Sequence, residues 1–204
     1  MAKKKTPKKE LEEVETLTEQ PLPKELPEEK IKEKIRATFA RERVLTEDHG
    51  SGHELYDQSR FGEPKEGKLN YSLVEALYLL EKGKMDVYDG KTLLTHELYI
   101  KRARMAEPNF WIRYCVFRDL RSRGYIVKTA LKFGADFRVY DRGVKPGDDH
   151  ARWIVFPVNE GDTLTWYEFA AKNRVAHSTR KRLLLAIVDE ENSVTFYECR
   201  WLRP

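Results

Sequence analysis

The sequence predicts an α+β fold in which a small N-terminal α/β domain precedes a C-terminal domain built around a mixed β-sheet. Three observations support this prediction. Residues 1–35 are dominated by lysine, glutamate and proline; residues 36–107 alternate between strand and helix periodicity; residues 108–204 hold a helix followed mostly by apolar strands. We therefore expect a disordered charged tail at 1–35 and folded domains at 36–107 and 108–204.

The tail lacks the apolar side chains that a core needs. It contains four prolines and no aromatic residue, since Phe39 is the first aromatic residue of the chain. Such a segment cannot bury enough apolar surface to offset the conformational entropy that folding removes. Its basic residues 3–9 fit a solvated tail, although they also suit contact with a polyanion.

The N-terminal domain is predicted from alternating strand and helix patterns. Ser72 is a suitable helix N-cap because Glu75 stands three residues later, as in a capping box, and Gly83 follows the helix where a C-cap would lie. The expected elements are a strand at 36–46, a helix at 72–81, a strand at 85–88 and a helix at 94–104.

The C-terminal domain is predicted to begin with a helix at 110–123, which Gly124 ends, and to contain a second helix at 165–174. Its other apolar stretches indicate strands at 125–131, 137–140, 152–158, 182–188 and 194–202.

Composition restricts the class of protein. Lys and Arg number 38 against 34 Asp and Glu, and a net charge of +4 indicates nucleic-acid binding only if the basic residues cluster. Cys115 and Cys199 lie far apart without metal-ligand spacing, so we expect buried or half-buried free thiols. No stretch approaches the roughly 20 apolar residues of a membrane span, and no signal peptide is recognised. These features favour a cytoplasmic protein without a membrane partner.

Several enzyme motifs are absent from the sequence. It contains no glycine-rich phosphate loop, no zinc-spaced Cys and His cluster and no nucleophile elbow. The carboxylate pattern of two-metal nucleases is also missing from the C-terminal strands. His49 and His53, next to Glu47 and Asp48, could suggest a metal site, but the glycines between the histidines indicate a mobile loop and no further ligands are placed nearby. We therefore expect no metal site and no cofactor.

Three residues of the C-terminal domain occupy positions where reactive side chains often occur. Tyr140 ends an apolar strand, His150 precedes the next strand after a loop, and Lys181 immediately precedes the strand at 182–188. Taken singly, each also has an ordinary explanation as a strand-end, loop or solvated surface residue. Composition alone does not decide between these explanations and a phosphate-binding site.

The segments FRVYDRG, RWIVFPV behind a histidine, and RVAHSTRKRLLLAIVD, in that order, resemble the catalytic C-terminal domain of tRNA-splicing endonucleases. The upstream segment YSLVEALYLLEKGKMDVYDG is similar to the small N-terminal domain of the archaeal members. The resemblance covers residues 36–204 and implies a nuclease-like C-terminal domain.

This resemblance implies a catalytic triad of Tyr140, His150 and Lys181. It also implies that Arg174 and, by a looser match, Arg200 clamp a bulged base in the active site of a neighbouring subunit. His177 is nearer to Lys181 along the chain but lies outside the family's histidine position. We expect His177 to have a capping or surface role.

The implied reaction is a metal-independent cleavage of precursor tRNA at bulge-helix-bulge splice sites, which makes the enzyme a tRNA-intron lyase. The products carry 2′,3′-cyclic phosphate and 5′-hydroxyl ends. His150 suits the acid that protonates the leaving oxygen, and Lys181 suits stabilisation of the phosphate charge. Tyr140 either acts as the base or positions the 2′-hydroxyl, and the sequence leaves both roles open.

The resemblance also implies assembly. The C-terminal strands of two subunits are expected to pair, and an acidic loop of one subunit is expected to dock in a positive cleft of another. Asp189, Glu190 and Glu191, in the turn between the last two strands, are the candidate docking residues. A homodimer, a homotetramer and a heterotetramer with a non-catalytic paralogue all fit this pattern.

Three other functions compete with this interpretation. A structural subunit of the same family would lack part of the triad, and a metal-dependent DNA nuclease would carry the missing carboxylate motif. An RNA-binding module of another class would expose aromatic residues among basic ones. The tryptophans instead fall mostly in apolar patterns and are expected in the core or an interface; they are Trp111, Trp153, Trp166 and Trp201.

Overall fold

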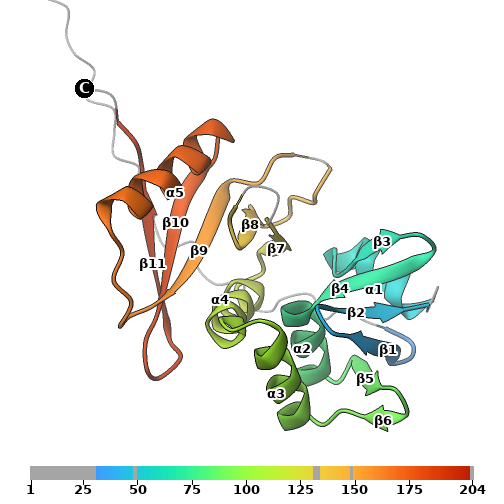
Figure 1. Ribbon diagram of the computed structural model, residues 1–204. Coiled ribbons are helices and arrows are strands. Elements are labelled where there is room, and N and C mark those ends of the chain that lie inside the picture. The colour runs from blue at the N-terminus through green and yellow to red at the C-terminus, as the bar shows by residue number, and fades with distance from the viewer. Residues whose placement is uncertain (1–30, 48–49, 131–133, 148, 203–204) are drawn as a thin grey trace, which may run out of the picture.

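The computed structural model describes residues 31–47, 50–130, 134–147 and 149–202. Most of the predicted tail and His49 of the expected loop lie outside these ranges. The described residues form five helices and two mixed β-sheets, which confirms the α+β class (Figure 1). An N-terminal unit runs from β1 to α3, and a C-terminal unit runs from α4 to β11.

The N-terminal unit contains a sheet with the strand order β3-β4-β2-β1-β5-β6. β1 pairs in parallel with β5, and the other neighbours are antiparallel. Its strands are β1 (Ile35–Ala40), β2 (Arg43–Thr46), β3 (Glu63–Lys65), β4 (Lys68–Ser72), β5 (Met85–Asp89) and β6 (Thr92–Leu93). Its helices are α1 (Ser51–Ser59), α2 (Leu73–Glu81) and α3 (His96–Ala106).

Two expectations for this unit are wrong. The single strand expected at 36–46 is a hairpin, because Arg41 adopts φ 58° and reverses the chain between β1 and β2. The loop expected at 49–53 overlaps α1, which begins at Ser51. Gly52 lies inside this helix because a Cβ there would come within 2.7 Å of the Leu69 side chain on β4. The sequence pattern predicted a loop here, but close packing against β4 explains why glycine stands near the start of α1.

The capping box of α2 is confirmed. The Ser72 hydroxyl accepts a hydrogen bond from the Glu75 N–H, and the Glu75 carboxylate accepts one from the Ser72 N–H at 2.9 Å. The same carboxylate also accepts a bond from the Gly62 N–H at 3.2 Å. Glu75 is buried, so this cap belongs to the interior of the protein.

The C-terminal unit contains a sheet with the order β11-β10-β9-β8-β7 between two helices. Alternate residues of β10 show this arrangement: Leu184 belongs to the core that includes α4, whereas Leu183 packs with Ala176 of α5. The strands are β7 (Ile126–Thr129), β8 (Phe137–Tyr140), β9 (Trp153–Asn159), β10 (Arg182–Val188) and β11 (Val194–Cys199). The helices are α4 (Phe110–Ser122) and α5 (Trp166–Ser178).

One apolar core joins the two units. Phe61 and Tyr78 of the N-terminal unit stack with centroids 5.7 Å apart, and Phe117 of α4 lies 5.9 Å from Tyr78 and 6.5 Å from Phe61. α4 thereby lies between α2 and the second sheet (Figure 1). The packing of α4 against the second sheet is therefore shared with the N-terminal unit.

The remaining expectations divide. Cys115 is buried and Cys199 half-buried, both as free thiols, as predicted. Trp153 is buried, but Trp166 and Trp201 are 85% and 56% exposed and lie outside the core of this chain. None of the helices in the described ranges combines the length and apolar character that crossing a membrane requires.

Candidate functional site

Three neighbouring strands of the second sheet end or begin at the same place. This edge of the sheet, which runs across the strands and not along an outer strand, is called the sheet edge. β8 runs antiparallel to β9, and β9 runs parallel to β10, so the end of β8 meets the beginnings of β9 and β10 there. The backbone of Arg152 bridges this edge, donating to β8 and accepting from β10 at 2.9 Å each. Tyr140, His150 and Lys181 all lie within two residues of this bonded row, so strand register brings the expected triad to one edge.

Tyr140 is the last residue of β8 and only 4% exposed. Its side chain packs with Ile126, its register partner in β7, and with Ala151 and Val144. Two of these contacts come from the segment between β8 and β9. The ring is therefore held from both the strand and the loop, which restricts where its hydroxyl can point.

His150 has a different environment. Its residue is exposed, and its backbone N–H donates to the Asp149 carboxylate at 2.6 Å. The imidazole thus lies at the solvent side of the edge, where a large substrate can reach it. An imidazole in this position can exchange a proton with a bound substrate.

Lys181 is positioned by the way α5 ends. The Arg180 N–H bonds to the His177 carbonyl at 3.0 Å and the Lys181 N–H to the Ala176 carbonyl at 2.8 Å, which is a Schellman motif. Arg180 occupies its left-handed position with φ 55°. The Lys181 ammonium donates to the Thr179 carbonyl at 2.9 Å. This turn sends the chain directly into β10 and leaves a half-buried cation at the edge.

Several charged side chains near this edge form ion pairs. Arg152 contacts Asp141 at 3.2 Å. Farther along, the Glu198 carboxylate accepts from Trp153 at 2.8 Å, from Arg200 at 2.6 Å and from Arg182 at 3.3 Å. Partial burial raises the pKa of Glu198, but the bonds from Trp153 and Arg200 and the charge of Arg182 outweigh burial and lower it.

The two expected RNA-clamping arginines differ. Arg174 is exposed on α5, whereas Arg200 turns back to Glu198. Trp201 occupies the position facing α5 instead: its ring lies 4.7 Å from that of His177, one helical turn from Arg174. An aromatic side chain at the surface near Arg174 is a binding candidate that the sequence pattern assigned to the core or an interface.

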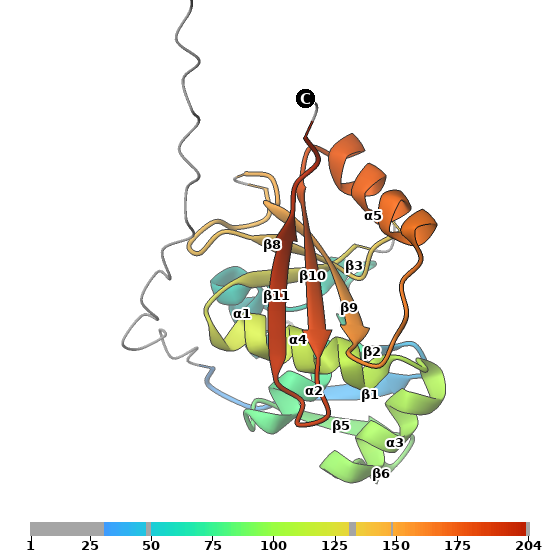
Figure 2. The same ribbon diagram turned by 90° about the vertical axis from the view of Figure 1, so that its left-hand side faces the viewer.

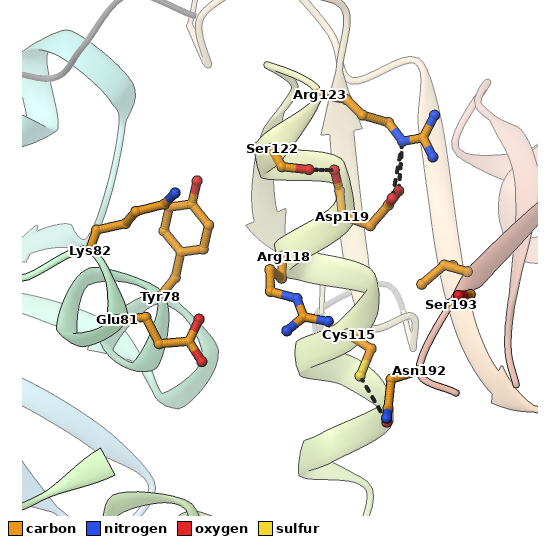
Figure 3. A pocket seen from close by; sticks show the side chains of 11 residues that line it. Tyr78, Glu81, Lys82, Cys115, Arg118, Asp119, Ser122, Arg123, Asn192 and Ser193 are labelled. Atoms are coloured by element: carbon orange, nitrogen blue, oxygen red, sulfur yellow. Dashed lines mark hydrogen bonds and ion pairs between the residues drawn. The ribbon is translucent and has the colours of Figure 1, made fainter. Parts of the chain in front are cut away.

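The acidic turn has one structural and two exposed carboxylates. The Asp189 carboxylate accepts from the Ser193 N–H at 2.8 Å and so closes the turn. Asn192 secures it to α4, since its side-chain oxygen accepts from Cys115 Sγ at 3.7 Å (Figure 3). Glu190 and Glu191 are exposed. A docking role is therefore better suited to Glu190 and Glu191 than to Asp189.

Two hollows lie between the units, and both contain basic residues. The larger, of about 500 Å³, separates Glu81 on α2 and the C-cap residue Lys82 from Arg118 on α4, and it reaches the acidic turn at Asn192 (Figure 3). The smaller, of about 300 Å³, has Arg60, Lys128 and Arg138 in its lining together with the carboxylate of Glu63. Positive charge therefore exceeds negative charge more clearly in the smaller hollow.

Metal ligands do not gather in the part of the chain that the structure describes. Across residues 31–47, 50–130, 134–147 and 149–202, no three His, Cys, Asp or Glu side chains form a group suited to a metal ion. His53 lies in α1 of the N-terminal unit, whereas Tyr140 ends β8 of the C-terminal unit.

Sequence comparison agrees with this architecture. Residues 35–100 match the family model described as the N-terminal domain of tRNA intron endonuclease, and residues 110–196 match its catalytic C-terminal domain. The chain is 42% identical over 173 residues to the tRNA-splicing endonuclease of Thermococcus onnurineus (strain NA1), covering 85% of this chain and 99% of that protein.

Relatives from other archaea are comparably similar. The tRNA-splicing endonuclease of Nanoarchaeum equitans (strain Kin4-M) is 47% identical over 138 residues, covering 65% of this chain and 88% of the relative. The tRNA-splicing endonuclease of Methanothermobacter thermautotrophicus is 41% identical over 150 residues, covering 74% of this chain and 87% of the relative. With both domains of the family matched and the similarity extending over nearly whole relatives, the chain belongs to the tRNA intron endonuclease family.

Proposed function

We propose that this chain cleaves precursor tRNA at bulge-helix-bulge splice sites with Tyr140, His150 and Lys181. The observation that carries the proposal is their convergence: three strands deliver a buried phenol, an exposed imidazole and a half-buried ammonium to one sheet edge. An in-line attack by a ribose 2′-hydroxyl needs a group that activates the hydroxyl, an acid that protonates the leaving oxygen and a cation that stabilises the charge on the phosphate. The three side chains match these roles.

In the proposed reaction, the 2′-oxygen forms a bond to phosphorus while the bond to the 5′-oxygen breaks. The ionised oxygen of Tyr140 takes the proton of the 2′-hydroxyl, and the protonated imidazole of His150 gives a proton to the departing 5′-oxygen. Lys181 stabilises the negative charge that grows on the phosphate oxygens. The products are a 2′,3′-cyclic phosphate and a 5′-hydroxyl, so atoms and protons balance without water.

We further propose that no metal ion takes part. The ammonium of Lys181 supplies the charge stabilisation, and His150 supplies the acid, so these side chains cover the roles for which many nucleases use bound cations. Cleavage should therefore persist in excess chelator, once folding of the RNA has been checked by native gel. Activity that vanishes in chelator and returns with Mg²⁺ would contradict this part.

The substrate is proposed to be held by α5 and the chain end. Trp201 contacts His177, which lies one helical turn from Arg174, and both Arg174 and Trp201 are exposed. A flipped base is proposed to stack between this guanidinium and indole. Arg200 remains a second candidate, but its bond to Glu198 must first break.

Assembly is proposed to use two surfaces. β11 is an edge strand of the second sheet, and Tyr197 on it is 55% exposed (Figure 2). A second copy can pair with this edge. Glu190 and Glu191 are proposed to dock in the smaller hollow of another subunit, because the larger hollow adjoins the acidic turn of its own chain.

The test is single-turnover cleavage of a minimal bulge-helix-bulge RNA with analysis of the product ends. His150→Ala and Lys181→Ala should each slow cleavage by roughly 10²- to 10⁴-fold while the RNA affinity changes little, because binding is spread over many phosphates. The neighbouring surface variant Ser178→Ala serves as the control. Near wild-type cleavage by either triad variant would overturn the assignment. Binding of the RNA without cleavage by the wild-type chain would favour a structural subunit or a binding module.

A further inference from the structure

The C-terminal end of α1 is held by three cations from the C-terminal unit. Each cation donates to main-chain carbonyl oxygens rather than to a carboxylate at this end. The bonds run from Lys145 to Asp57 at 2.9 Å, from Arg121 to Ser59 at 3.1 Å, and from Lys128 to Arg60 and Gly62 at 2.9 and 2.8 Å.

The physical reason is the unpaired end of a helix. The last carbonyls of a helix lack partners within it, and together they carry partial negative charge that attracts cations. The last turn of α1 contains no basic residue of its own, and the helix ends on Arg60 in the left-handed conformation. The negative end of α1 is therefore compensated by the other unit of the protein.

Lys145 differs from the other two cations in its position. Arg121 and Lys128 are buried and belong to the regular elements α4 and β7. Lys145 is half-buried in the segment between β8 and β9, which begins after Tyr140 and leads to His150. Pro146, next to Lys145, forms a β-bridge with Asp149, next to His150. The bond from Lys145 to α1 therefore couples the N-terminal unit to the backbone beside the candidate acid.

We propose that Lys145 is a positioning residue for catalysis, holding the segment that leads to His150 against the C-terminal end of α1. This inference rests on the proposed function of His150. Near the start of the segment, Asp141 pairs with Arg152 and Val144 packs on Tyr140. Lys145 extends this support across to the other unit, close to Pro146, which lines the hollow between them.

The expected consequence follows from the sensitivity of catalysis to geometry. A misplacement of about 1 Å can reduce a rate by as much as roughly 10²-fold. Lys145→Met keeps the apolar stem but removes the donor, so we expect the single-turnover rate at saturating enzyme to fall about 10-fold or more. The concentration needed for half-saturation should change little. Lys145→Arg retains a cationic donor and should restore most of the rate.

The matched control is Lys91→Met, an exposed lysine in the turn between β5 and β6. It makes the same chemical change away from the sheet edge and should cut at the wild-type rate. Hydrogen exchange of the assembled enzyme provides a readout independent of activity. Backbone amides around Lys145 should exchange faster in Lys145→Met than in either the wild type or Lys91→Met.

Two results would overturn the inference. A wild-type rate for Lys145→Met, with unchanged exchange, would mean that the bond to Asp57 positions nothing. If Lys145→Met instead raises the concentration needed for half-saturation and reduces the salt dependence of RNA binding, with the maximal rate unchanged, then Lys145 contacts an RNA phosphate. These results differ from failure of the proposed function, in which the wild type makes no cyclic phosphate or His150→Ala cuts normally.

Discussion

The covered face between the two units contrasts with the open face formed by α5 and β11. On the covered face, Phe61 and Phe117 are each 1% exposed, and Lys128 is paired with Glu75 at 3.0 Å. On the open face, Trp166 and Tyr167 are 85% and 78% exposed. The apolar part of the covered face is completed within one chain. The open face retains aromatic surface of the kind that stacks on bases or packs against another subunit.

The largest predicted effect concerns the covered face. Lys128→Met leaves Glu75 buried without its ammonium partner and should lower the free energy of unfolding by about 3–5 kcal/mol. The double variant Glu75→Gln/Lys128→Met removes both charges and should recover part of this loss. Urea unfolding at pH 7 of the wild type and both variants measures the difference. Equal losses in the single and double variants would show that the buried charge is not the cause.

The same pair predicts a pH dependence. Burial raises the pKa of Glu75, but the Lys128 charge and the hydrogen bonds from Ser72 and Lys128 outweigh burial and hold it below the ordinary 4.5. The contribution of Glu75 to stability is therefore full above that value and lost as the pH falls through the folded-state pKa. In Lys128→Met burial dominates, so the pKa rises and stability is instead lost as the pH rises. Unfolding measured from pH 3 to 7 distinguishes the two signs.

The second prediction tests whether the covered face also receives a partner. Glu190→Lys with Glu191→Lys reverses the exposed charges of the turn but spares Asp189, which closes it. Like charges facing the basic hollow should weaken association of dimers by about 100-fold, or about 2.7 kcal/mol, and cutting should fall in parallel. Light scattering over a range of concentrations measures this. If the oligomer keeps its mass and full activity, the turn is a solvated hairpin tip with no docking role.

The third prediction concerns the open face. Arg174→Ala should weaken binding of bulged RNA by roughly 1–3 kcal/mol while binding of plain duplex RNA changes less, because a stacking contact is lost. Arg174→Lys is the informative partner variant, since lysine keeps the charge but not the planar group. Titrations of both RNAs at fixed salt separate the roles. Full rescue by lysine would mean that Arg174 contacts only a phosphate.

Sequence patterns predicted the elements whose signals are local. The capping box of Ser72 and Glu75 and the strands 137–140 and 182–188 appear where they were expected. Patterns failed where packing decides. Arg41 turns a hairpin without the glycine or asparagine that usually marks one, and α1 incorporates Gly52 because Leu69 leaves no room for a side chain.

The candidate site divides in the same way. The resemblance to the family, carried by the order of the three motifs, nominated Tyr140, His150 and Lys181, whereas the local pattern around each residue left its role open. The attachment of Lys145 to Asp57 spans 88 residues and has no local signal. Likewise, Arg200 was nominated for binding within a strand expected to run to Leu202. The strand instead ends at Cys199, and the Arg200 side chain bonds to Glu198.

The smallest predicted effect is on folding of the open face. Trp166 begins α5 and touches Phe169, but most of its side chain meets solvent, so Trp166→Ser should change the unfolding free energy of the separated subunit by no more than about 0.5 kcal/mol. Trp153→Ser is the matched substitution: it removes a buried indole and its bond to Glu198, and should cost about 3–5 kcal/mol. Thermal unfolding at several protein concentrations measures both. If Trp166 contacts another subunit, its variant should lose stability only at high concentration, where the wild type is assembled. A large loss at every concentration would mean that Trp166 supports the fold of its own chain, and the contrast between the covered and open faces would fail.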